Sequence, residues 1–329
     1  MSSNKALLHP LRFAPKLYNR VWGGEKLVRD LNKTTTLGSV GESWEISGVP
    51  NKESIVLEGE HKGQTLNDLI VQYGAEFLGQ KVYERFGGQF PLLVKFIDAA
   101  KPLSVQVHPN DDWAQKEHNS FGKNEMWYLL DTDPNASISL GFDRKLSPEA
   151  LDEHIAQGTL EEVLNTIPVA CGDAFNIPTG LVHAIGAGVL LAEIQQTSDI
   201  TYRIFDYNRT DPVTGEKRPL HVGQAKKVAD FSSVNQQAIQ YEKTKNTVNA
   251  LIATPYFKSH YLHIEGRLER SLEDLDSFVI LIGVSGTAEL SCAATTYTLN
   301  RGEVLLLPAC LKHFVVHAAQ AKMLEVYIP

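Results

Sequence analysis

One short stretch of the sequence brings together side chains that can bind a metal. In residues 103–109, Ser104, Gln106 and His108 alternate with valines, and alternate side chains of a strand lie on the same face. A hydroxyl, an amide and an imidazole are costly on a face turned toward a core unless something there binds them. The stretch therefore predicts a strand whose Gln106 and His108 offer two donor groups to a metal.

Two residues further along the chain can complete such a site. Glu125 adds a carboxylate and His183 a second imidazole, and this nitrogen and oxygen set suits Zn²⁺ or another first-row divalent ion. Taken singly, each has an ordinary explanation, because a lone strand histidine is usually just hydrogen-bonded and Glu125 alone fits a surface carboxylate. Catalytic zinc sites usually have three protein ligands, so we infer that the amide of Gln106 is a weak fourth ligand. A divalent ion beside one carboxylate leaves a charge of about +1, which suits catalysis on an anion.

The elements that must position these residues are mostly strands. Apolar residues at three- and four-residue intervals predict helices over residues 66–86 and 147–164. Lys95 interrupts a dense apolar run, where a lysine is either buried or extends to solvent at a sheet edge. Residues 110–122 are polar and are expected to form a loop. Alternation and short apolar runs predict strands over 11–22, 41–47, 90–98, 125–130 and, with turns between them, from 169 to the end.

Length and composition narrow the function classes. The chain has 329 residues, enough for about two domains, and a net charge of −8, which argues against a nucleic-acid surface. Three cysteines without CxxC spacing favour a reducing cytoplasm over a disulfide framework. Residues 1–10 lack the pattern of an export signal, and no stretch reaches the roughly 18 apolar residues of a membrane span. We therefore expect a cytoplasmic protein with neither a nucleic-acid nor a membrane partner.

An internal repeat predicts the architecture. Residues 172–183 and 302–313 share the pattern Gly-acid-x₄-Pro-x₄-His, which ends in His183 and in His313. This pattern resembles the second motif of the cupin superfamily. The resemblance implies a mainly β bicupin, two antiparallel jelly-roll barrels in tandem with a few added helices. We expect an N-terminal catalytic cupin domain with helical insertions over 1–235 and a degenerate C-terminal one over 236–329.

The two copies of the repeat are not equivalent. Counting back from the repeat places the apolar Phe278 where the first copy has Glu125, and no Gln-x-His precedes it. His313 is therefore interpreted as a structural remnant rather than a ligand, and the N-terminal domain is expected to hold the chemistry.

Longer motifs resemble one family over nearly the whole chain. Residues 20–24 (RVWGG), 104–109 (SVQVHP), 123–128 (KNEMWY), 178–183 (PTGLVH) and 193–203 (EIQQTSDITYR) are similar to type I mannose-6-phosphate isomerase, and most similar to its short bacterial form. The last four of these motifs, found in this order, are specific. The resemblance implies an enzyme that uses one Zn²⁺ per chain to interconvert mannose 6-phosphate and fructose 6-phosphate through an enediol.

The resemblance also implies a role for each matching residue. The metal ligands are Gln106, His108, Glu125 and His183. The catalytic residues are Arg203, Lys123 and Glu193, and the residues near the substrate are Ser104, at its phosphate, with Lys95, Asp199, Trp22 and Glu42. The base that moves the proton stays open among Glu193, Lys123 and a metal-bound water, because burial and neighbouring charges can tune each toward neutral pH. The expected partner is a small sugar phosphate, and the expected state is a monomer or weak homo-oligomer.

Two positions depart from long-form members of the family. Ile185 stands where they carry a pocket tyrosine, and Gly122 stands where some bacterial long forms carry a histidine, so roles of those side chains do not transfer. Two other functions are considered. One is a bicupin that binds a sugar or metal without turnover, and the other is a cupin oxygenase, which would want iron and an open coordination position. Arginine and the two lysines are not needed for metal binding alone, which favours the isomerase.

Overall fold

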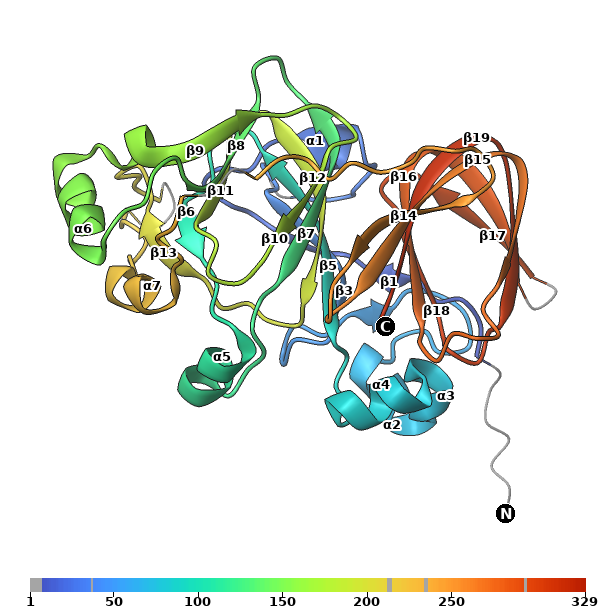
Figure 1. The fold of residues 1–329 in the computed structure, drawn as a ribbon. Helices are drawn as coiled ribbons and strands as arrows, with labels where there is room; N and C mark the ends of the chain where they lie inside the picture. Colours follow the sequence, from blue (N-terminus) through green and yellow to red (C-terminus); the bar gives the residue numbers. More distant parts are fainter. Residues whose placement is uncertain (1–7, 37, 212–214, 234–235, 293–294) are drawn as a thin grey trace. The chain divides into compact units, whose positions relative to one another are not determined.

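The computed structural model describes residues 8–36, 38–211, 215–233, 236–292 and 295–329 (Figure 1). The first seven residues of the N-terminal stretch considered above, and residue 235 at the expected domain boundary, lie outside these ranges. The described residues form two compact units. One unit comprises 17–43 and 94–239, and the other comprises 1–16, 44–93 and 240–329.

Two antiparallel sheets carry the motif residues. The first has the strand order β10-β7-β12-β5-β3-β2 and the second the order β13-β6-β11-β8-β9. Boundaries between the units fall inside β2, β3 and β5. The strands are β2 (Lys16–Tyr18), β3 (Glu42–Ser47), β5 (Leu92–Ala99), β6 (Val105–Val107), β7 (Glu125–Thr132), β8 (Ser137–Phe142), β9 (Leu164–Pro168), β10 (Ala174–Ile177), β11 (His183–Ile185), β12 (Val189–Gln196) and β13 (Tyr202–Phe205).

Apolar side chains from both sheets pack into one core. Trp127 and Leu129 of β7 cluster with Ile138 and Leu140 of β8, so the first sheet packs face to face on the second. β5 and β12 are buried along their whole length, which explains why apolar residues stand on both of their faces and only a few polar residues, such as Lys95 and Glu193, interrupt them. The strands predicted over 41–47, 90–98 and 125–130 are confirmed as β3, β5 and β7.

The single helix predicted over residues 66–86 is replaced in the structure by three short helices. Helix α2 (Leu66–Tyr73) begins at a capping box between Thr65 and Asp68, and α3 (Ala75–Leu78) and α4 (Gln80–Phe86) follow. Gly74 and Gly79 separate them at φ angles of 54° and 92°, which side chains other than glycine rarely adopt. Apolar residues keep their three- and four-residue spacing across both glycines, so this periodicity alone does not predict that the helix is interrupted.

The other helices correct two further expectations. The second predicted helix stops earlier, because α6 (Pro148–Gln157) ends at Gly158 in the left-handed conformation. Residues 110–122, expected to be a loop, contain α5 (Asp111–His118), which Asn110 caps through a hydrogen bond from the Trp113 N–H. Its side chains are almost all polar, so no apolar period marked it. The remaining helices are α1 (Lys26–Arg29), the 3-10 turn Leu160–Val163 and α7 (Val222–Val228).

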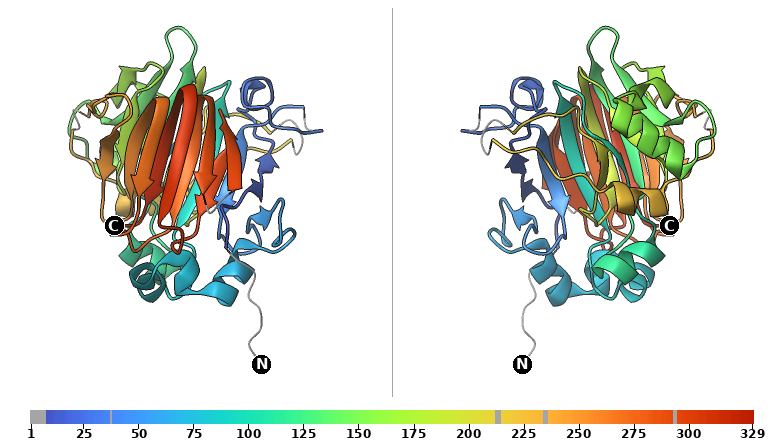
Figure 2. Two further views of the ribbon diagram at one scale, coloured as in Figure 1. Left: turned by 90° about the vertical axis from the view of Figure 1, so that its right-hand side faces the viewer. Right: turned by 90° about the vertical axis from the view of Figure 1, so that its left-hand side faces the viewer.

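The C-terminal part is a separate antiparallel sheet. Its strand order is β14-β15-β19-β16-β17, with β18 also paired to β16, and the left view of Figure 2 looks onto its long strands. The strand pairings among the described residues do not close this sheet into a barrel. The unit's strands are β1 (Phe13–Ala14), β4 (Ile55–Val56), β14 (Val248–Ala253), β15 (Lys258–Ser271), β16 (Val279–Cys292), β17 (Thr295–Asn300), β18 (Val304–Leu307) and β19 (His313–Tyr327).

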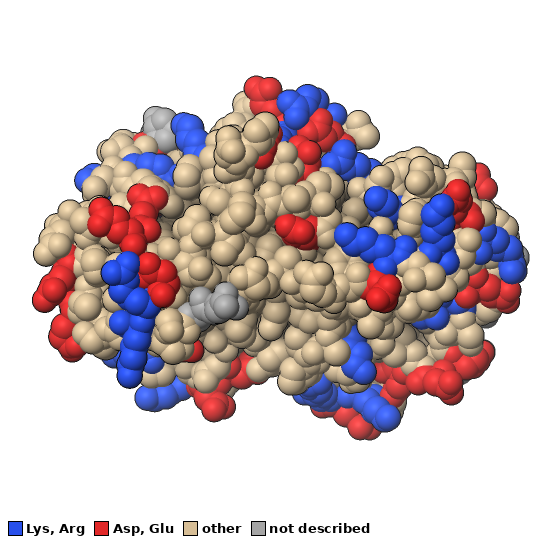
Figure 3. Space-filling model, turned by 45° about the horizontal axis from the view of Figure 1, so that its top comes forward, with Lys and Arg blue, Asp and Glu red and all other residues tan. Residues whose placement is uncertain are grey.

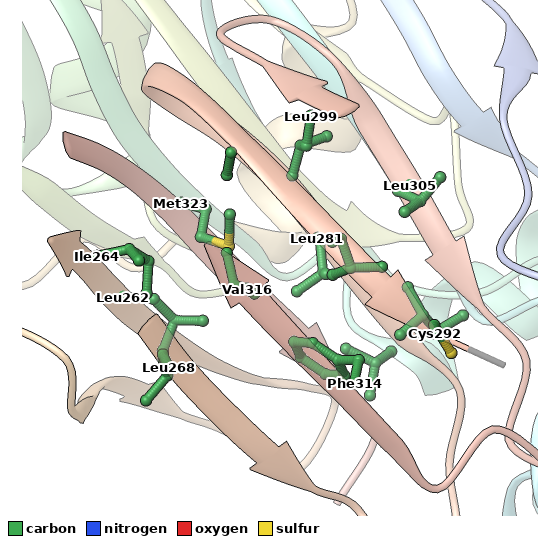
Figure 4. Packing of buried hydrophobic residues seen from close by; sticks show 14 of the residues in the cluster. Leu262, Ile264, Leu268, Leu281, Cys292, Leu299, Leu305, Phe314, Val316 and Met323 are labelled. Carbon is green, nitrogen blue, oxygen red and sulfur yellow. The ribbon is translucent and has the colours of Figure 1, made fainter. Parts of the chain in front are cut away.

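The strands of this C-terminal sheet share one hydrophobic core. Leu262 of β15, Leu281 of β16 and Phe314 and Met323 of β19 cluster on one side of it (Figure 4). Phe278 is fully buried and packs on Phe90, with ring centroids 4.7 Å apart. An apolar ring thus occupies the place that corresponds to Glu125 of the first repeat.

On the face drawn in Figure 3, lysines and arginines are interspersed with acidic residues. Among the helices of the described ranges, none has the length and apolar character needed to cross a bilayer.

Candidate metal centre and active site

Strand β6 lies between two strands that carry other motif residues. Gln106 pairs with His183 of β11 on one side and with Arg203 of β13 on the other. Directly paired residues of antiparallel strands point to the same face. An amide, an imidazole and a guanidinium are therefore neighbours on the face of the second sheet that meets the first sheet.

Three candidate ligands meet between the two sheets. The nearest ligand atoms of His108, Glu125 and His183 all lie within 4.8 Å of one another. His108 follows β6, His183 begins β11 and Glu125 begins β7 of the opposite sheet. At most 1% of any of the three residues is exposed. Three ionisable groups withdrawn from water at this spacing are typical of a metal centre.

Hydrogen bonds at Nδ1 orient the imidazole rings of His108 and His183. Nδ1 of His108 lies 3.1 Å from the Ile200 carbonyl oxygen, and Nδ1 of His183 lies 2.8 Å from that of Leu181. Because a carbonyl only accepts, each Nδ1 donates its proton, and each Nε2 keeps a lone pair for the centre. Glu125 Oε2 and His183 Nε2 have no hydrogen-bond partner among the described residues. Such a donor set fits a divalent cation.

In this structure the cation that contacts the ligands is the ammonium group of Lys123. It lies 3.1 Å from Nε2 of His108 and forms an ion pair with Oε1 of Glu125. Burial opposes ionisation of Glu125, but Lys123 and the two histidines outweigh it and hold the Glu125 pKa well below its usual range. Burial and the Lys123 charge lower the pKa of His108 to about 3. The centre therefore consists of a carboxylate and two neutral imidazoles.

A second buried ion pair lies on the same sheet. Lys95 Nζ lies 3.0 Å from Glu193 Oε1, and Trp127 Nε1 donates to Glu193 Oε2 at 3.1 Å. Burial and the nearby charge of Glu125 raise the pKa of Glu193. Lys95 is 6% exposed, so it is buried rather than extended to solvent at an edge.

Of the remaining predicted residues, Glu42, Trp22 and Ser104 lie in or beside the two sheets. Glu42 forms a two-pronged ion pair with Arg20 at 3.0 and 3.1 Å, and its charge acts on buried Lys95. Trp22 belongs to the core of the two sheets, and Ser104 is buried directly before β6. Asp199 is exposed on the loop between β12 and β13.

Several contributing residues were not singled out in the sequence. Asn124 lies between Lys123 and Glu125. The backbone N–H and the side-chain amide of Asn124 both donate to Oε1 of Gln196, at 3.0 and 2.9 Å. Gln196 in turn donates to Asp111 at the start of α5 at 2.9 Å. These bonds fix the backbone that presents Lys123 and Glu125. A polar pair such as Gln195-Gln196 at the end of an apolar strand was the available signal.

Two family models match the chain. The catalytic domain of type I phosphomannose isomerase matches residues 11–141, and the cupin domain of mannose-6-phosphate isomerase matches residues 246–328. Together with the strands and the histidine and glutamate centre, they define a mainly β protein of the cupin class.

Individual relatives extend this similarity to nearly the whole chain. Mannose-6-phosphate isomerase ManA of Bacillus subtilis is 35% identical over 93% of this chain and 95% of its own length. Mannose-6-phosphate isomerase of Streptococcus mutans is 32% identical over 93% of this chain and 94% of its own. A crystal structure of the Bacillus subtilis enzyme superposes with a TM-score of 0.86 at 31% identity, covering 97% of this chain and 99% of that one. The chain belongs to the type I mannose-6-phosphate isomerase family.

Proposed function

We propose that the protein is a metal-dependent aldose-ketose isomerase that interconverts mannose 6-phosphate and fructose 6-phosphate. The observation that carries this proposal is the buried centre of His108, Glu125 and His183, with the Lys95–Glu193 ion pair beside it, in a member of this family. Buried charge pairs with shifted pKa values cluster at catalytic sites, which favours turnover over metal binding alone.

We propose that one Zn²⁺ per chain is held by His108, Glu125 and His183, with Gln106 as a weak fourth ligand. The direct pairing of Gln106 with His183 in the sheet supports the proposed role of Gln106 as a ligand. The bound ion would supply positive charge that polarises the oxygens of the sugar's carbonyl and hydroxyl groups.

The chain's own residues are proposed to move the proton and orient the sugar. Isomerisation removes a proton from the carbon next to the carbonyl and returns one to the neighbouring carbon. We propose Glu193, whose pKa is raised by burial, and Lys123, which lies beside His108, as the two side chains that carry out this transfer. Arg203, opposite Gln106 in the sheet, adds a fixed positive charge near the developing enediolate.

Five further residues are proposed to bind or enclose the substrate. Ser104 directly precedes β6, the charge of Glu42 acts on Lys95, and Trp22 belongs to the core of the two sheets. Asp199 is proposed to act from its exposed loop. The residues are Ser104, Lys95, Asp199, Trp22 and Glu42.

The two departures from long-form relatives have a structural setting. A Cβ atom on Gly122 would lie 2.7 Å from the backbone of Asn110 and Asp111, so a histidine does not fit there without a backbone shift. Ile185 is 1% exposed and belongs to the core between the sheets. We therefore propose that the proton is transferred without either of those long-form side chains.

The architecture that best accounts for the repeat is a bicupin. We propose two antiparallel jelly-roll domains, a catalytic one over 1–235 with helical insertions and a degenerate one over 236–329. His313 is exposed and lies 2.8 Å from Glu269, as suits a structural rather than a ligand role. We further propose a cytoplasmic enzyme, monomeric or weakly homo-oligomeric, without nucleic-acid or membrane partners.

The test is to incubate the purified, zinc-loaded protein with mannose 6-phosphate and to follow fructose 6-phosphate by ¹³C NMR. We expect approach to the same equilibrium mixture from either sugar phosphate. Binding of mannose 6-phosphate without interconversion would instead identify a non-catalytic bicupin. Consumption of O₂ by the iron-loaded protein would identify an oxygenase.

Replacing Arg203 with alanine is expected to lower kcat by about 100-fold, because a fixed charge at a developing oxyanion is worth roughly 2.7–4 kcal/mol. Its Nη1 donates to the Pro219 carbonyl at 2.8 Å and its backbone pairs in β13, so far-UV circular dichroism and zinc content should stay unchanged. Arg144→Ala is the matched control, because Arg144 is exposed and pairs only with its neighbour Asp143 among the described residues. Unchanged kcat in Arg203→Ala would remove Arg203 from the reaction.

A further inference from the structure

Strand β13 lies at the edge of the second sheet, so it has a neighbouring strand on one side only. On that side Arg203 pairs with Gln106 of β6, and the register of the pairing shifts between Arg203 and Phe205. Such a shift interrupts the ladder of hydrogen bonds locally. The position of Arg203 therefore depends on contacts from outside the sheet.

His221 binds both backbone groups of Arg203. The Arg203 N–H donates to Nδ1 of His221 at 3.2 Å, and the His221 N–H donates to the Arg203 carbonyl at 2.7 Å. In an antiparallel ladder, alternate residues direct both backbone groups away from the partner strand, and the side chains of such a pair lie closer together. Because Arg203 directs both groups to His221, Arg203 and Gln106 form such a pair.

The segment that contains His221 also binds the side chain of Arg203. Nη1 of Arg203 donates to the Pro219 carbonyl at 2.8 Å. Pro219 and His221 thus contact the side chain and the backbone of the same arginine. A positive charge stabilises a developing oxyanion best when it is fixed before the reaction, because no reorganisation is then needed in the transition state.

The His221 side chain is directed to β13 rather than to its own helix. His221 is the N-cap residue of α7, and its carbonyl accepts from the Ala225 N–H at 2.8 Å. N-cap side chains commonly accept a hydrogen bond from the first helical turn, but that of His221 does not. Its ring centroid lies 6.4 Å from that of Tyr202, the neighbour of Arg203 in β13.

The hydrogen bond from Arg203 requires a neutral imidazole. Nδ1 of His221 accepts the Arg203 N–H, so the ring proton is on Nε2. Burial and the charge of Arg203 lower the pKa of His221 below its usual value. The neutral ring is therefore the main form at pH 7, and the acceptor is available to Arg203.

We propose that His221 is a positioning residue that holds Arg203 beside Gln106 in the orientation that isomerisation requires. This inference rests on the proposed isomerase function. His221 acts through Arg203 and has no contact with the reacting atoms. The motif in residues 193–203 ends at Arg203, so the sequence comparison gave His221 no role.

The kinetic test is His221→Phe, which keeps an aromatic ring near Tyr202 but removes the acceptor for the Arg203 N–H. We expect kcat for mannose 6-phosphate to fall roughly ten- to a hundred-fold, with KM changed less than about two-fold, because the charge of Arg203 acts in the transition state. His154→Phe is the matched control. It removes an Nδ1 hydrogen bond to Thr159 elsewhere in the same unit and should leave kcat at the wild-type value.

A double-mutant cycle distinguishes positioning from a general loss of structure. When Arg203 is already alanine, His221→Phe should lower the residual kcat less than about two-fold, because the effects of two residues that act as one unit are not additive. A general folding defect would lower kcat by the same factor with and without the arginine. Equal factors in the two backgrounds would therefore overturn the role of His221.

A measurement without substrate separates this inference from the isomerase activity. Amide hydrogen exchange, followed by NMR on ¹⁵N-labelled and zinc-loaded protein, reports how well the Arg203 N–H is protected. Exchange at Arg203 should be at least about ten-fold faster in His221→Phe than in wild type, and unchanged in His154→Phe. Faster exchange in a protein that does not isomerise mannose 6-phosphate would contradict the proposed function alone. Isomerisation with wild-type exchange or wild-type kcat in His221→Phe would overturn the positioning role alone.

Discussion

Replacing Glu125 with glutamine is expected to lower isomerase activity by at least about a thousand-fold. The change keeps the size of the side chain but removes the only carboxylate of the centre, between Nε2 of His108 at 3.4 Å and Nε2 of His183 at 3.9 Å. A metal that polarises an oxygen supplies several kcal/mol to the reaction, and each 1.36 kcal/mol is a factor of ten. The measurement is kcat/KM together with zinc bound per chain by elemental analysis.

Two outcomes of that experiment are informative about Glu125. Zinc content should fall together with activity, because a neutral amide binds Zn²⁺ more weakly than a carboxylate. Glu153→Gln is the matched control, because Glu153 is exposed on α6 of the same unit. If Glu125→Gln retained full zinc and wild-type turnover, the metal centre would have to lie elsewhere.

Replacing Glu325 with alanine is expected to lower the free energy of unfolding by roughly 3–5 kcal/mol, the usual cost of removing one partner from a buried ion pair. Glu325 is fully buried in β19 and accepts two hydrogen bonds from Arg270, at 2.8 and 2.9 Å. His260 lies 2.9 Å away. Without Glu325, the charge of Arg270 remains inside the C-terminal sheet with no carboxylate to balance it. Urea unfolding followed by circular dichroism measures the loss.

The same residue predicts a pH dependence. Burial raises the pKa of Glu325, but the hydrogen bonds and charges of His260 and Arg270 outweigh it, so the folded pKa lies below the ordinary 4.5. A depressed folded pKa contributes stability above the unfolded value, and that contribution is lost as the pH falls through the folded pKa. The difference between wild type and Glu325→Ala should therefore be full at pH 7 and shrink below about pH 4.5.

Glu269→Ala provides the comparison for Glu325. Glu269 lies in the same sheet, pairs with Arg267 and His313 at 2.9 and 2.8 Å, and keeps 53% of its side chain exposed. Surface pairs of this kind are worth about 0–1 kcal/mol. Equal losses in both variants would show that the Glu325 charge is not specifically stabilising.

The candidate ligands could be predicted from sequence because their signals are local. Alternation in residues 104–108 placed Gln106 and His108 on one face, and the repeat ending in His183 indicated a second histidine. The sequence did not determine which residues of the neighbouring strands pair with them. The pairing of β6 with both β11 and β13, which sets Gln106 between His183 and Arg203, depends on strand order in space rather than on any spacing along the chain.

Other features were missed for definite physical reasons. Helix α5 is stabilised by the cap at Asn110 rather than by an apolar stripe, so periodicity could not find it. The breaks between α2, α3 and α4 follow from the positive φ angles of Gly74 and Gly79, within a pattern that stays apolar. Arg209 and Arg218 follow Asp206 by 3 and 12 residues in the sequence, and only the fold brings both of them to its carboxylate.

The central claim is that a divalent metal at His108, Glu125 and His183 is required for isomerisation of mannose 6-phosphate. The most direct test is to strip the purified protein with a chelator, remove the chelator, and measure isomerase activity while Zn²⁺ is added back in steps. We expect activity to be lost with the metal and to return linearly, reaching a plateau at about one Zn²⁺ per chain. Full isomerase activity in protein shown by elemental analysis to contain no metal would contradict the account.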